Sequence, residues 1–268
     1  MSFYVITKKH IHDGFFAKFI HVLMHLTIAE KKGLIPFIDF QTPINNLHDP
    51  QNTQTNNTWE YCFEQGYTIE DVYNSNPILS DGLYQSFYNA HGKHFRSKEL
   101  TSLFHDLYKK YIKVKPEILE KLNTEITQYK TLGVHCRRSD MSLSHPEIAL
   151  NYSNEIFFEK TMKIFNDGNF EKIYLATEEI NILEHFKNTI PDKVFYHDCF
   201  RVLPNEQPVT KMSDRFMHRT LQCQEVLIDA LNLSKCNSLL CGISGVSNSV
   251  TFINGLKFDE VYYFDEID

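Results

Sequence analysis

The chain has 268 residues, 42% of them hydrophobic and 23% charged, and its 27 basic and 34 acidic side chains give a formal net charge of −7. This composition is typical of a soluble globular protein with room for one large hydrophobic core or two compact ones. The acidic balance argues against a protein that coats nucleic acid, because that activity needs clustered Lys and Arg. A polyanion bound by this chain is therefore expected to be small and held locally.

The sequence carries no signal for a membrane span or for secretion. No apolar run approaches the roughly 18 residues that cross a bilayer, and residues 1–10 lack the apolar core of a signal peptide. We therefore expect a cytoplasmic protein. Its six cysteines include no C-x-x-C pair, which favours reduced, mostly buried thiols over a zinc ribbon or a disulfide framework.

The first half of the chain opens with a predicted β-α-β unit. A strand at 3–6, a helix at 14–32 that Gly33 ends, and a strand at 34–40 imply a parallel strand pair. Residues 41–57 are polar and indicate a loop long enough to be functional or mobile. Aromatic-rich short elements follow, and then a helical stretch over 98–130 that Pro116 must break or kink.

From residue 131 onward, strands and helices alternate. The predicted strands are 131–136, 172–176, 193–196, 238–241 and 260–264, and the predicted helices are 154–166, 179–188, 213–235 and 246–254. This alternation predicts an α/β lobe with a doubly wound parallel sheet. We expect two lobes, 1–130 and 131–268, of which the second is the more regular.

Ligands of doubly wound sheets lie beyond the carboxyl ends of the strands, so the turns there are the first candidates for function. The turn after the first strand of the second lobe carries Arg137 and Arg138. Guanidinium groups match phosphate oxygens bidentately, which suits a diphosphate. The alternative is a surface arginine pair bonded to acidic neighbours.

Two further turns have unusual composition. Thr177 precedes two glutamates, where it either caps the next helix or lies near a ligand. Residues 242–249 join a strand to a helix through small side chains that permit close approach of an anion. This turn contains neither the Walker A pattern nor G-x-G-x-x-G, which excludes those two nucleotide fingerprints. His21 and His25 lie four apart on a predicted helix; without a third ligand, we expect a structural pair rather than a metal site.

Together these turns resemble the α1,6-fucosyltransferase, nodulation fucosyltransferase and protein O-fucosyltransferase superfamily. Residues 133–140 (GVHCRRSD) look like its first motif, 173–179 (IYLATEE) like its second, and the stretch from Asp229 to Ser244 like its third. Residues 14–22 are similar to its N-terminal glycine-containing segment. The resemblance covers roughly 12–40 and 130–255.

The resemblance implies a GT-B glycosyltransferase, with two Rossmann-like lobes and parallel sheets, a reduced N-terminal lobe on the acceptor side, and a C-terminal lobe that binds the nucleotide sugar. The donor-binding residues implied by it are His135, Arg137, Arg138, Thr177, Asp229, Ser244, Gly245 and Ser247. Arg137 and Arg138 would stabilise the departing GDP, as a metal does in other enzymes, so no metal or cofactor is expected beyond the GDP-sugar co-substrate.

Departures from the family pattern affect the acceptor side. Gly14 is retained in the N-terminal loop, whereas Phe16 replaces its second glycine and Lys18 replaces a glutamine. An inverting transfer needs a base near the acceptor hydroxyl. Glu147 is the first candidate, followed by His145 and then Asp140, for which a salt bridge to the arginines is the alternative role.

The sequence thus predicts an inverting, metal-independent glycosyltransferase that uses a GDP-sugar, with GDP-fucose as the first choice. The expected acceptor is a glycan, a glycolipid or a protein hydroxyl; nucleic acid is excluded, and peripheral contact with a membrane is compatible with the sequence. The alternatives are the same fold with another nucleotide-sugar donor, and a non-catalytic protein that binds a nucleotide or a glycan.

Overall fold

The chain divides into two compact α/β units. The computed structural model describes residues 2–7, 11–42, 44–80, 96–137, 152–203 and 214–267. Unit 1 comprises Met1–Glu120, Arg215–Gln224 and Thr251–Leu256, and unit 2 comprises Lys121–Asp214, Glu225–Val250 and Lys257–Asp268. Sequence periodicity suggests one boundary near residue 130; here the chain leaves unit 1 after Glu120 and returns to it in two short segments. The acceptor and donor roles of the two parts stay predictions.

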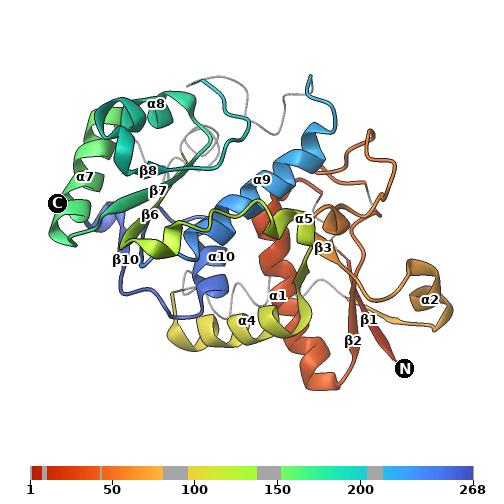
Figure 1. The fold of residues 1–268 in the computed structure, drawn as a ribbon. Helices are drawn as coiled ribbons and strands as arrows, with labels where there is room; N and C mark the ends of the chain where they lie inside the picture. The colour runs from red at the N-terminus through yellow and green to blue at the C-terminus, as the bar shows by residue number, and fades with distance from the viewer. Residues whose placement is uncertain are drawn as a thin grey trace. The chain divides into compact units, whose positions relative to one another are not determined.

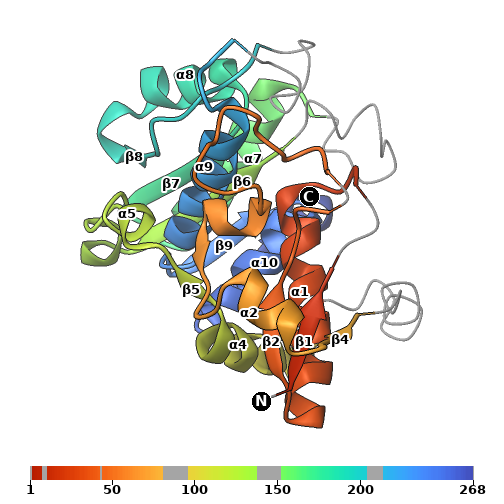
Figure 2. The same ribbon diagram turned by 90° about the vertical axis from the view of Figure 1, so that its right-hand side faces the viewer.

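Unit 1 is built around a parallel sheet with strand order β2-β1-β4. Its elements are β1 (Phe3–Ile6), α1 (Phe15–Lys32), β2 (Ile35–Ile38), η1 (Thr58–Tyr61), β3 (Phe63–Glu64), α2 (Ile69–Asn74), β4 (Ile78–Leu79), α4 (Lys98–Tyr111), β5 (Lys113–Val114) and α5 (Pro116–Leu119). Parts of α9 (His218–Leu233) and α10 (Gly245–Asn254) complete it. Helix α1 packs against this sheet, as Figure 2 shows.

The predicted β-α-β opening is confirmed. Strands β1 and β2 are parallel, with Phe3 opposite Ile35. Gly33 ends α1 in the left-handed conformation at φ 63°, and its N–H bonds the carbonyls of Ala29 and Glu30. Pro36 fits inside β2 because, in the described residues, β2 is an edge strand, where a missing N–H on the outer side costs no ladder bond.

The predicted helical stretch over 98–130 is wrong in its second half. Helix α4 ends at Tyr111, and Lys113 and Val114 form β5, which pairs antiparallel with β3. Pro116 does not interrupt a helix; it occupies the first turn of the short helix α5, a position that needs no N–H donor.

Unit 2 contains a parallel sheet with strand order β10-β9-β6-β7-β8. Its elements are η2 (Ile126–Gln128), β6 (Thr131–Cys136), α7 (Asn154–Asp167), β7 (Lys172–Thr177), α8 (Ile180–Thr189), η3 (Pro191–Lys193), β8 (Val194–Phe195), β9 (Ser238–Cys241), β10 (Val261–Tyr263) and η5 (Phe264–Glu266), with the remaining parts of α9 and α10. These elements confirm the predicted alternation of strands and helices.

Helices cover both faces of this sheet (Figure 1). On one face, side chains of β6, β7 and β9 join α7 and α8 in a core that contains Leu132, Val134, Cys136, Phe157, Phe165, Ile173, Leu175, Ile182, Leu183, Phe186 and Leu240. The other face receives α9. Gly133 lies on that side, where a Cβ atom would stand only 3.1 Å from Leu233 and from Cys236 Sγ. The absence of a side chain at Gly133 therefore lets the end of α9 approach the sheet closely.

The polar segment 41–57 contains no helix or strand among its described residues. Asparagine and aspartate side chains bond backbone N–H groups two residues ahead, with Asn45 bonded to Leu47, Asp49 to Gln51, and Asn52 to Gln54. These are Asx turns, which give a chain without regular hydrogen bonding a defined path. The abundance of Asn and Asp in this segment is thus explained by its local turns.

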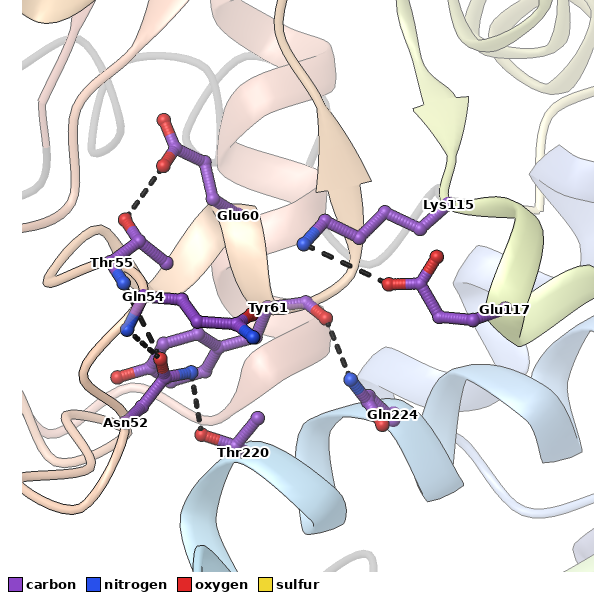
Figure 3. A network of polar contacts seen from close by, with 9 residues as sticks. All are labelled: Asn52, Gln54, Thr55, Glu60, Tyr61, Lys115, Glu117, Thr220 and Gln224. Carbon is purple, nitrogen blue, oxygen red and sulfur yellow. Dashed lines mark hydrogen bonds and ion pairs between the residues drawn. The ribbon is translucent and has the colours of Figure 1, made fainter.

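Contacts drawn in Figure 3 fix this segment, and the 3-10 helix η1 that follows it, to other parts of unit 1. Asn52 donates to Thr220 Oγ1 at 3.1 Å, and Gln224 donates to the carbonyl of Tyr61 at 3.1 Å. Asp49, 2% exposed, accepts from the backbone N–H of Thr220 at 2.9 Å. Thr220 lies in the first turn of α9, so this carboxylate satisfies a helix N–H that has no partner within the helix.

Candidate functional site

The carboxyl ends of β6 and β9 flank the point at which the sheet of unit 2 reverses its winding. From β6 the chain order proceeds through β7 and β8 in one direction, and through β9 and β10 in the other. Doubly wound sheets bind ligands at such a switch point. The three predicted donor-binding turns follow the ends of β6, β7 and β9, so the structure brings them to one edge of the sheet.

His135 and Arg137 lie at the end of β6. In a strand, alternate residues share a face, so His135 is on the same side as Gly133, the side that α9 covers. His135 is 7% exposed. Burial, and secondly the charge of Arg137, lower the pKa of His135 to about 3. The imidazole is therefore neutral at physiological pH and offers one donor and one acceptor nitrogen.

The turn after β7 differs from the predicted helix cap. Helix α8 begins at Ile180, and its N-cap position is Glu179, whose side chain makes no capping bond. Thr177 Oγ1 accepts from the N–H of Glu179 at 3.2 Å. The two carboxylates precede the helix because Glu178 and Ile180 exchange backbone hydrogen bonds with Val202, which keeps this stretch extended.

Arg201 is a further cation at this edge, and no sequence motif indicates it. Its guanidinium donates to the carbonyls of Thr177 at 3.1 Å, Cys199 at 3.3 Å and His197 at 2.6 Å. It thereby fastens the segment after β8 across the end of β7. The positive charge of Arg201 also lowers the pKa of Asp229, against the larger effect of burial.

The turn after β9 is closed by two serines. Ser244 N–H donates to Ser247 Oγ at 2.9 Å, and Ser247 N–H donates to Ser244 Oγ at 3.0 Å. This reciprocal pair has the geometry of a capping box at the start of α10, where Gly245 is the first residue. Ser247 is buried and also donates to the carbonyl of Gly242, so its hydroxyl has a structural role.

Asp229 lies on α9 and faces the sheet. Its Oδ1 accepts from the hydroxyl of Tyr174 at 2.7 Å, and Tyr174 Oη accepts from Asn232 Nδ2 at 3.0 Å. Burial is the main cause that raises the pKa of Asp229 to about 7, and the Tyr174 hydrogen bond and the charge of Arg201 oppose it. Carboxyl groups that titrate near neutrality are common at functional sites. His135 and Asp229 both lie on the side of the sheet that α9 covers.

Several predicted residues lie outside the described residues. They are Arg138, Asp140, His145 and Glu147. The candidate bases and the second arginine therefore stay predictions from the sequence.

Gly14 and Lys18 of the predicted N-terminal loop are in unit 1, at the start of α1. Gly14 is the N-cap residue, and its carbonyl accepts from the N–H of Lys18. Lys18 is 3% exposed; its ammonium donates to the carbonyl of Asp13 and to Asn46 Oδ1. The lysine therefore ties the loop before α1 to segment 41–57.

The two histidines of α1 lie in the interior of unit 1 and bond to neighbouring groups. His21 and His25 are buried, with ring centroids 4.3 Å apart. His21 Nε2 bonds the carbonyl of Thr7, and His25 Nδ1 bonds the hydroxyl of Tyr4. Among the described residues, no group of three or more His, Cys, Asp or Glu side chains could hold a metal ion.

A cavity of about 470 Å³ lies elsewhere in unit 1, along the outer edge of β2. Its lining residues are Glu30, Gly33–Ile38, Trp59, Glu64–Tyr67, Lys110 and Tyr111. None of them is a predicted site residue. Gln65 closes part of this edge, because its side-chain amide bonds both the N–H and the carbonyl of Ile38.

Solved structures similar to this chain include fucosyltransferases. NodZ alpha-1,6-fucosyltransferase soaked with GDP-fucose superposes with a TM-score of 0.59 and 15% identity, over 99% of this chain and 96% of its own. Fucosyltransferase NodZ from Bradyrhizobium gives 0.58 and 15%, over 100% and 97%. POFUT1 in complex with GDP-fucose gives 0.52 and 11%, over 98% of each chain. The chain has the fold of these fucosyltransferases.

The GT-B fold class expected from the sequence is thereby confirmed. No protein-family model matches the chain, and a search of curated protein sequences finds no match. In the part of the chain that the structure describes, no helix is both long enough and apolar enough to cross a membrane.

Proposed function

We propose that the protein is an inverting, metal-independent glycosyltransferase that transfers a sugar from a GDP-sugar, with GDP-fucose as the first choice of donor, to a hydroxyl group of a glycan, glycolipid or protein. One observation carries the proposal. At the switch point of unit 2, the end of β6 presents Arg137 and the end of β9 presents the start of α10, a pair suited to a diphosphate. The similar folds that bind GDP or GDP-fucose support guanosine as the nucleoside.

The proposed reaction follows from this charge distribution. The oxygen of the acceptor hydroxyl forms a bond to the anomeric carbon while the bond from that carbon to the diphosphate oxygen breaks. The acceptor proton passes to a general base, for which Glu147 is the first candidate, and GDP leaves with the bonding electron pair. Arg137, at the end of β6, would stabilise the developing negative charge on the diphosphate. Neutral His135 and the carboxylate of Asp229 would contact the guanosine.

A thermal-shift comparison of GDP, UDP, ADP and CMP tests the nucleotide. GDP at about 100 times its Kd stabilises the folded state by about 2.7 kcal/mol, which raises Tm by roughly 5–10 °C for a chain of this size. Arg137→Ala is expected to lose most of this rise. Lys193→Ala is the control. It removes a positive charge beside the amino end of β8, at the opposite edge of the same sheet, and should keep the GDP-induced rise in Tm.

If none of the four nucleotides raises Tm in the unsubstituted protein, the proposal is wrong. Transfer assays with GDP-fucose then distinguish an enzyme from a protein that only binds nucleotide. Glu147→Gln is expected to retain the GDP shift and to lose transfer.

A further inference from the structure

The hydrogen bonds around Asp229 run in one direction. The backbone N–H of Asn123 donates to Asn232 Oδ1 at 3.0 Å, which fixes the orientation of the amide. Asn232 Nδ2 must then donate to Tyr174 Oη, at 3.0 Å. Since the tyrosine oxygen accepts this bond, its own proton points to Asp229 Oδ1, at 2.7 Å.

This order determines how Asp229 can be protonated. Oδ1 always accepts from Tyr174, so a proton on the carboxyl group must reside on Oδ2. Among the described residues, no hydrogen bond reaches Oδ2, and Asp229 keeps 8% of its surface exposed, whereas Tyr174 and Asn232 are almost fully buried. Oδ2 is therefore the oxygen that a ligand meets: an acceptor when Asp229 is ionised and a donor when it is protonated.

We propose that Tyr174 and Asn232 are positioning residues that hold Oδ2 of Asp229 as a hydrogen-bond acceptor and so set the preference of the site for guanine. The inference rests on the proposed function. Guanine carries two adjacent donors, N1–H and the 2-amino group, where adenine presents an acceptor at N1. An ionised, fixed carboxylate therefore favours guanine, and a protonated one opposes N1–H.

The charged and titratable groups that face Asp229 come from three elements. Tyr174 is on β7, Glu225 lies one turn earlier on α9, and Arg201 and Cys199 belong to the segment after β8. Arg201 favours the ionised carboxylate and Glu225 opposes it. The Tyr174 hydrogen bond lowers the pKa of Asp229 against the effect of burial, so its loss should move the titration to higher pH.

The test measures Kd for GDP, IDP and ADP by calorimetry between pH 6 and pH 9. IDP lacks the 2-amino group and shows how much that donor contributes. In the unsubstituted protein, we expect GDP affinity to fall as pH drops below about 7 and ADP affinity to change little. Tyr174→Phe should weaken GDP about tenfold and ADP less than about threefold, and should move the pH midpoint for GDP upward by about one unit.

Tyr152→Phe is the matched control. Its hydroxyl donates to the carbonyl of Phe264 at 3.2 Å, and its ring packs with the core on the α7 and α8 face of the same sheet. This variant should leave the GDP affinity and its pH profile unchanged. If Tyr174→Phe does not fold, Asn232→Ala tests the same series of hydrogen bonds, because it frees the tyrosine hydroxyl to turn away from Asp229.

The outcomes separate the two proposals. Normal GDP binding with an unchanged GDP-to-ADP ratio and pH midpoint in Tyr174→Phe overturns the positioning role and leaves the proposed function intact. Failure of the unsubstituted protein to bind GDP at any pH overturns the proposed function, and this inference with it.

Discussion

Replacing Asp229 by asparagine is expected to stabilise the protein at neutral and alkaline pH. Burial raises the pKa of Asp229 from 3.8 to about 7, so the folded protein holds this proton more tightly than the unfolded chain does. The stability that comes from the protonated group is fully present below pH 3.8 and is lost as pH rises through about 7. At 1.36 kcal/mol per pKa unit, the complete loss is roughly 4 kcal/mol.

Most of this loss falls in a range that is easy to measure. Between pH 5 and pH 8 the linkage removes roughly 2–3 kcal/mol of stability from the unsubstituted protein. Asp229→Asn has no such titration and can still accept from Tyr174. Its Tm minus that of the unsubstituted protein should therefore grow by roughly 5–10 °C over the interval, measured by differential scanning fluorimetry in buffers of equal ionic strength.

Asp198→Asn is the control, because this aspartate is exposed in the segment after β8. It should change Tm by about the same small amount at each pH. A difference for Asp229→Asn that stays constant from pH 5 to pH 8 would refute the reasoning, since it would mean that Asp229 titrates alike in the folded and unfolded states.

Two further substitutions test packing and helix capping. Gly133→Ala places a Cβ 3.1 Å from Leu233 and Cys236, and should lower the free energy of unfolding in urea by about 1–3 kcal/mol. Gly66→Ala is its control: no atom lies within 4 Å of the added Cβ, and the free energy of unfolding should change by less than about 0.5 kcal/mol. In Asp49→Asn, the single side-chain oxygen can no longer accept from the N–H groups of both Thr220 and Gln51, and the free energy of unfolding should fall by about 1–2 kcal/mol. Asp106→Asn, on the exposed side of α4, is the control and should change little. Equal unfolding midpoints for the two variants would contradict the capping role of Asp49.

Long elements could be predicted from the sequence because burial imposes a period on them. Helix α1 and strands β6, β7 and β9 have the expected positions, since apolar residues repeat along each of them and Gly33 ends the helix. The error after Tyr111 has a non-local cause. Lys113 and Val114 form a strand instead of continuing the helix, because they pair with Glu64 and Phe63, about fifty residues earlier in the chain.

The candidate site could be predicted from the sequence only in part. The turns after β6, β7 and β9 could be selected from their residue types, because a parallel sheet brings the carboxyl ends of its strands to one edge. Tyr174 and Arg201 could not be selected from the sequence. Tyr174 acts through Asp229, which is 55 residues away, and Arg201 through carbonyls that only the folded segment after β8 presents.

The packing of α9 connects the stability of unit 2 with the chemistry of its edge. Gly133 has no side chain, so Leu233 and Cys236 pack directly on β6, while Tyr174, opposite Gly133 in the register, reaches Asp229 and Asn232 on the same helix. A core built for stability alone would place apolar side chains here, because a buried ionisable carboxylate is costly. The hydrogen bonds from Asn123 to Asp229 orient that carboxylate toward the part of its surface that remains exposed. A ligand that accepts this geometry offsets the cost, and a guanine base has the donors to do so.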